Sequence, residues 1–506
     1  MTPPRGAFRR ERGFIVAVAA IAALRALVFA GAFPFFTNVD EHRHVDMAMK
    51  YARGALPRPE TATYEPGFPR LLAVYGTQEY VLPAGRAPAP PTWQVGEAAR
   101  TRRIEANARH FGSAPNLEIF QSPFYYSLAG AWLGLWRWLG LDWGAALYAM
   151  RALGALAIAA LIGVAYRLVR ETHPGSAVMR IGVPVLLAAA PLDVIHYVTG
   201  DALSPLVGGL AFALLVRLAI DPDRGGAAFA MAGLVTAAAF LTKSTHIVVI
   251  GLLCGVSVQL VKAAPADLRH ERLVRFALLW TGLLVPVGLW VARTHHLTGS
   301  ALGTASKVAG LGWTLRPLSA WGSHPLFTPG GAWEFLSGLV PIFWRGEVVW
   351  HQTVLASPLA DAVYGVTTGL FVLAAVAALL RPAPAPRAGD AARFVETASV
   401  YCVGAAVAVL AALSLRFLFT ETSNPSESHP YFVQGRLVAG VWLPFAILYV
   451  RGIEWSCGLL PARWRATSAF AVIALVAGVA LVSELWLSLP VFGSPYNFYH
   501  LPAGHG

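Results

Sequence analysis

The chain has 506 residues, of which 56% are hydrophobic and only 13% are charged, and its mean hydropathy is +0.56. This composition excludes an ordinary soluble protein and indicates an integral membrane protein. The net charge of +12 does not indicate a nucleic-acid-binding protein, because the basic residues gather in short segments between apolar runs. We therefore expect membrane lipids as partners and no nucleic acid.

Eleven apolar runs are candidates to cross a hydrocarbon core of roughly 30 Å. Each must be helical, because lipid offers no hydrogen-bond partner to an unpaired backbone group. We therefore predict an all-α polytopic membrane protein with about eleven transmembrane helices. The predicted spans are 14–36, 145–166, 181–198, 202–218, 227–242, 245–261, 276–292, 359–380, 395–415, 437–450 and 466–488.

The predicted topology divides the chain into three parts. Residues 1–293 form a transmembrane core that includes a large first loop at about 37–144. Residues 294–358 form a second loop region, and residues 359–506 form the C-terminal transmembrane helices. Long loops without secondary structure are uncommon unless they are functional, so we expect the site in these loops.

Basic residues indicate the orientation of the bundle. Arginines precede the first span, and the later short loops on the same side are net basic or neutral, which is typical of the cytoplasmic side. Both long loops then lie outside the cytoplasm. The segment 123–139 would invert every later loop if it crossed the membrane alone, so we predict that this aromatic-rich segment is an interfacial helix.

The densest polar cluster follows the first span, where six of the seven residues 40–46 are ionisable. If this stretch is helical, Asp40 and His44 share a face. A carboxylate there can act as a general base on a hydroxyl or amine, with Glu41 or His44 orienting it. Asn38 and Glu41 could instead form a capping box. A divalent metal on Asp40, Glu41 and His44 is a further alternative, without additional ligand spacing to support it.

Three more charged residues are predicted on the same outer face. Asp201 begins a span and is either a helix cap or a second acid of the site. Lys243 and Arg436 lie where the charge bias does not favour cations, so each either extends to the interface or binds a phosphate.

Two residues near the start of the interfacial helix complete the candidate site. Gln121 and Tyr125 could line a sugar or an isoprenoid, or they could only anchor the helix. Arg25, well inside the first span, is expected to be buried with a carboxylate partner.

In chain order, these motifs resemble the GT-C superfamily of polyprenyl-phosphate-sugar glycosyltransferases. This superfamily includes protein mannosyltransferases and lipid A aminoarabinose transferases, and the likeness is to bacterial members with an Asp-Glu-x-x-His first loop. The motifs that carry the resemblance are Asp40-Glu41 with His44, Gln121 to Tyr126, Thr199-Gly200-Asp201, Leu241-Thr242-Lys243 and Gln434-Gly435-Arg436.

The resemblance implies a GT-C-like bundle and a glycosyltransferase, inverting in mechanism, with Asp40 activating the acceptor. Asp201 is then a second acid, and Lys243 and Arg436 hold the lipid phosphate. The implied donor is a polyprenyl-phosphate-linked sugar, and the acceptor is a glycan, lipid or protein. The implied location is a bacterial inner membrane, with the site facing the periplasm or exterior. The alternative function is a secondary transporter or lipid flippase, whose ionisable residues would line a path at the membrane midplane.

Overall fold

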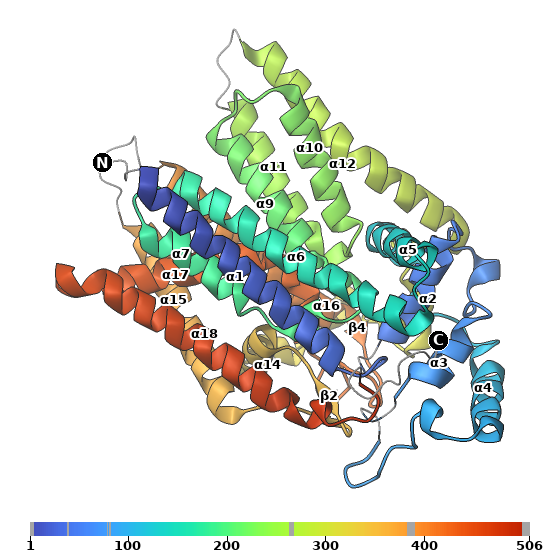
Figure 1. The fold of residues 1–506 in the computed structure, drawn as a ribbon. Coiled ribbons are helices and arrows are strands. Elements are labelled where there is room, and N and C mark those ends of the chain that lie inside the picture. The colour runs from blue at the N-terminus through green and yellow to red at the C-terminus, as the bar shows by residue number, and fades with distance from the viewer. Residues whose placement is uncertain are drawn as a thin grey trace.

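The computed structural model describes residues 5–37, 40–77, 79, 82–262, 268–381 and 390–497. Long helices dominate it (Figure 1). The helices of the bundle are α1 (Arg5–Ala32), α6 (Trp143–Thr172), α7 (Ala177–Ala188), α9 (Ser204–Ile220), α10 (Gly226–Phe240), α11 (Ile247–Lys262), α12 (Arg269–Thr298), α15 (Pro358–Leu380), α16 (Asp390–Arg416), α17 (Trp442–Cys457) and α18 (Ala462–Phe492).

Shorter elements gather mainly at one end of the bundle. The α-helices among them are α2 (Glu41–Ala52), α3 (Phe68–Tyr75), α4 (Glu97–Phe111), α5 (Pro123–Trp138), α8 (Leu192–Ile195), α13 (Ala305–Gly310) and α14 (Pro329–Arg345). The 3-10 helices are η1 (Pro59–Thr61), η2 (Thr92–Gln94), η3 (Gly200–Ala202), η4 (Ser244–His246), η6 (Leu318–Ser323), η7 (Pro325–Phe327) and η8 (Gly435–Val441). Two antiparallel strand pairs complete the fold: β1 (Thr314–Leu315) with β4 (Phe417–Leu418), and β2 (Val349–Trp350) with β3 (Thr353–Val354).

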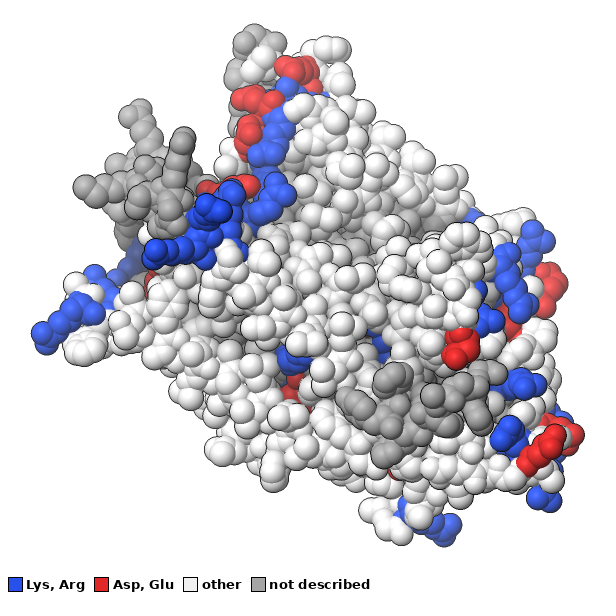
Figure 2. Space-filling view, in the orientation of Figure 1, with Lys and Arg blue, Asp and Glu red and all other residues white. Residues whose placement is uncertain are grey.

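The predicted all-α polytopic fold is confirmed. In the described part of the chain, nine helices are long and apolar enough to cross a membrane. Two other predicted spans are the shorter apolar helices α7 and α10, of 12 and 15 residues. Figure 2 shows a broad band with few charged side chains on this face, with charged side chains gathered at both ends of the molecule and Lys and Arg prominent where α1 begins. The protein is therefore an integral membrane protein.

The predicted span 181–198 is wrong in its second half, because α7 ends at Ala188 and mostly irregular chain continues to Thr199. At about 1.5 Å per residue, α7 rises only about 18 Å, too little to cross the core alone. Arg25 donates to the carbonyl oxygen of Ala188 (2.6 Å) and forms an ion pair with Glu484 of α18. The predicted burial of Arg25 with a carboxylate is thus confirmed, and irregular backbone is tolerated here because it is buried in protein.

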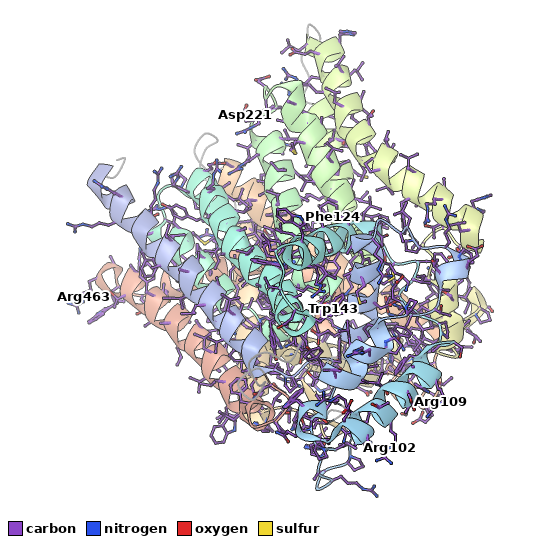
Figure 3. The ribbon with its side chains drawn as sticks, turned by 45° about the vertical axis from the view of Figure 1, so that its right-hand side comes forward. Arg102, Arg109, Phe124, Trp143, Asp221 and Arg463 are labelled. Carbon is purple, nitrogen blue, oxygen red and sulfur yellow. The ribbon has the colours of Figure 1, made fainter. Side chains whose placement is uncertain are left out.

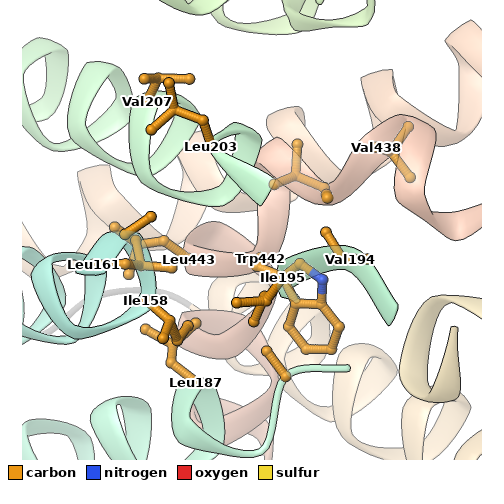
Figure 4. Close-up of a cluster of buried hydrophobic side chains, with 14 of the residues drawn as sticks. Ile158, Leu161, Leu187, Val194, Ile195, Leu203, Val207, Val438, Trp442 and Leu443 are labelled. Atoms are coloured by element: carbon orange, nitrogen blue, oxygen red, sulfur yellow. The ribbon is translucent and has the colours of Figure 1, made fainter. Parts of the chain in front are cut away.

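A common core joins the N-terminal and C-terminal parts of the chain. Figure 4 shows Leu161 of α6, Leu187 of α7 and Leu443 of α17 packed together. Gly208 of α9 approaches Gly440 of η8 so closely that an added Cβ would lie 2.5 Å from the Gly440 carbonyl oxygen. This close approach fixes the start of α9 against η8, so it also places Asp201 of η3, just before α9, near Arg436 of η8.

The segment 123–139 forms α5, which crosses the end of the bundle instead of running along it (Figure 1). It packs against α2 and α6. The backbone N–H of Phe124 donates to the carbonyl oxygen of Leu241 (2.9 Å), which ties the start of α5 to the end of α10. The Gln121 segment and Lys243 are thereby brought to one place.

Candidate active site

A cavity of about 410 Å³ lies at the end of the bundle where α1 ends, opposite the arginines in the first turns of that helix. Its lining residues come from the turn after α1, the short 3-10 turns η3 and η4 that precede α9 and α11, the segment after α12, the end of α16 and the start of η8. Antiparallel helices alternate in direction, so every second connection falls on the same side. Six of the eight predicted site residues line the cavity: Asp40, His44, Gln121, Asp201, Lys243 and Arg436.

Asp40 lies at the N-cap of α2, and its carboxylate is mostly buried, with 15% of the side chain exposed. Arg43 donates to its Oδ1 at 2.9 Å, and the Lys307 ammonium lies 3.8 Å from its Oδ2. Burial alone would raise the pKa of Asp40, but Lys307 and Arg43 hold that pKa well below its usual range. The carboxylate is therefore ionised at neutral pH.

Lys307 of α13 was not found by sequence reasoning, because nothing in its local sequence distinguishes it from a surface lysine. It forms an ion pair with Glu118 as well as with Asp40. Burial would lower the pKa of Lys307, but Glu118 and Asp40 raise it. Glu118, almost fully buried, was missed for the same reason. These two residues connect the second loop region to the first.

His44 lies one helical turn after Asp40, and its Nδ1 lies 2.6 Å from the hydroxyl of Tyr126. Tyr126 lines the cavity, whereas the predicted Tyr125 is buried and is not a lining residue. Tyr125 packs beside Gly200, where an added Cβ would lie 3.8 Å from its ring. It therefore contacts the turn that carries Asp201.

Asp201 and Lys243 form an ion pair, and Arg436 lies in the wall of the same cavity. The charge of Arg436 acts on both Asp40 and Asp201. The Thr199 hydroxyl accepts a hydrogen bond from the Asp201 backbone N–H at 3.2 Å, which holds the turn at η3. Predicted from three separate motifs, these charged groups are brought together by the fold.

Glu41 does not line the cavity. It is fully buried and paired with Arg151 of α6 through two contacts, Nε to Oε1 at 2.9 Å and Nη2 to Oε2 at 2.8 Å. It also accepts from the backbone N–H groups of Phe36 (2.9 Å) and Val198 (3.1 Å). Phe36 has φ of 62°, a left-handed conformation that is unusual for a phenylalanine. We propose that Glu41 positions the turn before Asp40 and does not touch substrate; Asn38, its predicted capping partner, lies outside the described residues.

Among the described residues, no group of three or more His, Cys, Asp or Glu side chains is arranged to hold a metal. Of the three residues considered for a metal, Glu41 is occupied by Arg151 and His44 contacts Tyr126. The lining instead carries four cations and three carboxylates, so positive charge is in excess. The cations are Lys243, Lys307, Arg416 and Arg436, and the carboxylates are Asp40, Glu118 and Asp201.

A pH profile tests the coupling between Lys307 and Asp40. Replacing Lys307 by Met removes a cation that favours the ionised carboxylate, so the pKa of Asp40 should rise. Any activity that needs ionised Asp40 should then fall at a higher pH than in the wild type as the pH is lowered. The control is Lys262→Met, the same change on an exposed lysine at the last residue of α11, which does not line the cavity. Identical acid limbs in wild type and Lys307→Met would contradict this coupling.

No protein-family model and no curated protein sequence matches the chain. One similar solved structure is ArnT from Cupriavidus metallidurans bound to undecaprenyl phosphate, with 14% identity, a TM-score of 0.43, and coverage of 96% of this chain and 74% of that chain. Another is the archaeal oligosaccharyltransferase AglB from Archaeoglobus fulgidus in complex with an inhibitory peptide and a dolichol-phosphate, with 10% identity and a TM-score of 0.43. That match covers 94% of this chain and 56% of AglB, so the chain spans little more than half of AglB.

Proposed function

We propose that the protein is an inverting glycosyltransferase that moves a sugar from a polyprenyl monophosphate to an acceptor at the extracytoplasmic face. The observation that carries the proposal is the single cavity in which an ionised carboxylate, Asp40, faces Lys243 and Arg436. A base and an anion-binding group in one pocket are the two requirements for displacing a phosphate by a hydroxyl or amine.

The other lining residues suit a lipid-linked donor. One part of the cavity wall is apolar and aromatic and includes Trp313, Phe417 and Phe432. A polyprenyl chain could leave along such a wall while its phosphate stays with the cations. The Lys243–Asp201 ion pair holds the ammonium in the cavity, where a phosphate oxygen could share it.

In the proposed reaction, the acceptor oxygen or nitrogen forms a bond to the anomeric carbon while the bond from that carbon to the phosphate oxygen breaks. Asp40 takes the acceptor proton, and the polyprenyl phosphate leaves with one additional negative charge. Lys243 and Arg436 stabilise that charge. With its low pKa, Asp40 is a weak base towards a resting hydroxyl, so the proton moves late, when bond formation has made the acceptor acidic.

The distribution of basic residues supports an extracytoplasmic site. The cavity lies at the opposite end of the bundle from the arginines in the first turns of α1, and such residues favour the cytoplasm. In a polyprenyl-phosphate donor the sugar is activated by its bond to the lipid phosphate, so the proposed reaction needs no nucleotide at this outer face. We propose a bacterial inner membrane as the location.

The test is transfer of a labelled sugar by wild-type protein in vesicles of bacterial phospholipid that contain polyprenyl-phosphate sugars and a crude cell-envelope acceptor fraction. Label should move from the lipid to the acceptor, with polyprenyl phosphate released. If the donor is not consumed but a lipid or solute crosses the bilayer, the proposal fails and a transporter or flippase takes its place.

A further inference from the structure

A second cavity of about 410 Å³ lies on the other side of α2. His42 lines this second cavity, whereas Asp40 and His44 line the first. Residues two positions apart on a helix point in different directions, so α2 forms a wall between the two cavities. The reaction proposed above makes no use of the second cavity.

The second cavity is built by the first extracytoplasmic loop together with residues that follow α18. The aromatic residues that line it are Phe36, Phe111 and Tyr496, and the polar lining residues include His42, Arg103 and Asn107. No carboxylate occurs among the lining residues that the structure describes. Its volume lies in the range of roughly 300–1,000 Å³ that is usual for small-molecule sites.

Two of the polar side chains are left for a ligand. Within the described part of the chain, neither the His42 ring nor the Asn107 amide has a hydrogen-bond partner, although both line the cavity. Burial and the nearby Arg43 lower the pKa of His42 to about 4. The neutral imidazole therefore offers one donor and one acceptor, and the Asn107 amide offers both as well.

We infer that the second cavity binds an uncharged saccharide. Sugar hydroxyls need neighbouring donors and acceptors, which His42, Asn107 and Arg103 supply, and the apolar face of a sugar ring packs against aromatic side chains such as Phe111. A phosphate group would be better served by several cations, as in the first cavity. The second cavity has one lining cation, Arg103, and this guanidinium already donates to the carbonyl oxygen of Pro90.

The role of this saccharide rests on the proposed function: it is a unit of the acceptor that is not itself glycosylated. Arg43 links the two cavities, because it donates to Asp40 at 2.9 Å and also interacts with Tyr64. The Tyr64 ring stacks with His42 at a centroid distance of 6.2 Å. Binding energy from such a remote unit should favour the acceptor complex and the transition state alike, and so lower KM without changing kcat.

The experiment is a printed array of defined oligosaccharides probed with the full-length protein in lipid nanodiscs. Wild type should bind a small set of glycans, and His42→Phe and Asn107→Leu should each weaken that binding about 3- to 10-fold, the loss expected for one hydrogen bond. Phe preserves the ring stacking of His42, and Asn107 lies half-buried on α4, so both variants should fold. Arg109→Gln, on an exposed residue of the same helix (Figure 3), should bind as the wild type does.

A transfer measurement supplies the second readout: His42→Phe and Asn107→Leu should raise KM for the acceptor at unchanged kcat. No glycan bound by the wild type, binding unchanged in both variants, or selective binding of anionic phospholipid vesicles at this cavity would each overturn the inference. Glycan binding that depends on His42 and Asn107 without any sugar transfer would support this saccharide site while the proposed transferase fails. The two proposals are thus tested separately.

Discussion

Asp40→Asn should lower the rate of sugar transfer by about 10²- to 10⁴-fold, the range that general-base catalysis contributes. The amide has almost the same size, and its oxygen can still accept from Arg43 at the position of Oδ1. It cannot take a proton from the acceptor. The fold and the cations that would hold the donor phosphate should therefore persist while the chemical step is lost. The measurement is initial transfer in vesicles at matched protein content, with donor binding measured in parallel.

Glu60→Gln is the matched control, because Glu60 is an exposed carboxylate of η1 in the same loop as Asp40. It should transfer sugar at the wild-type rate. Asp40→Asn with wild-type turnover would exclude Asp40 as the base. A loss of donor binding that accounts for the whole defect would instead give Asp40 a role in binding the substrate.

Glu41→Ala should destabilise the protein by about 3–5 kcal/mol, because it leaves the guanidinium of Arg151 buried without its carboxylate. Arg151 also donates to the carbonyl oxygens of Ala30 (2.9 Å), Phe33 (2.6 Å) and Pro34 (2.9 Å), at the end of α1. The same substitution also removes the carboxylate oxygen that accepts a hydrogen bond from the backbone N–H of Phe36. The measurement is the midpoint of thermal unfolding in detergent micelles, which should fall well below that of the wild type.

Two comparisons separate this positional role from catalysis. Glu171→Ala breaks the pair with Arg217, which also has two contacts (2.7 and 2.9 Å) but a more exposed carboxylate, so it should cost at most about 1 kcal/mol. The double variant Glu41→Leu with Arg151→Met removes both charges and should be more stable than Glu41→Ala. If Glu41→Ala unfolds as the wild type does but loses transfer, Glu41 belongs to the chemistry after all.

Hydrophobic runs and charge bias allowed the all-α class and the shared side of the site motifs to be predicted from local sequence. A helix that crosses lipid must be apolar over its whole length, and basic residues favour the cytoplasmic side of the membrane. The number and direction of most spans can therefore be predicted from local sequence. Direction alone then places Asp40, Asp201, Lys243 and Arg436 at the same end of the bundle. The end of α7 at Ala188 was missed, because buried irregular chain is as apolar as a buried helix.

The pairing of charged groups was decided only by the tertiary structure. Asp40 and Glu41 are neighbours in an equally polar stretch, yet one faces Lys307 in a cavity and the other is enclosed with Arg151, 110 residues away. Likewise, Tyr126 lines the cavity and Tyr125 does not, although both lie at the start of α5. Sequence alone therefore determined a helical membrane protein with its polar motifs at one face. Which carboxylate meets which cation depends on the packing of distant helices, because an ion pair forms only where the fold brings two side chains within a few ångströms.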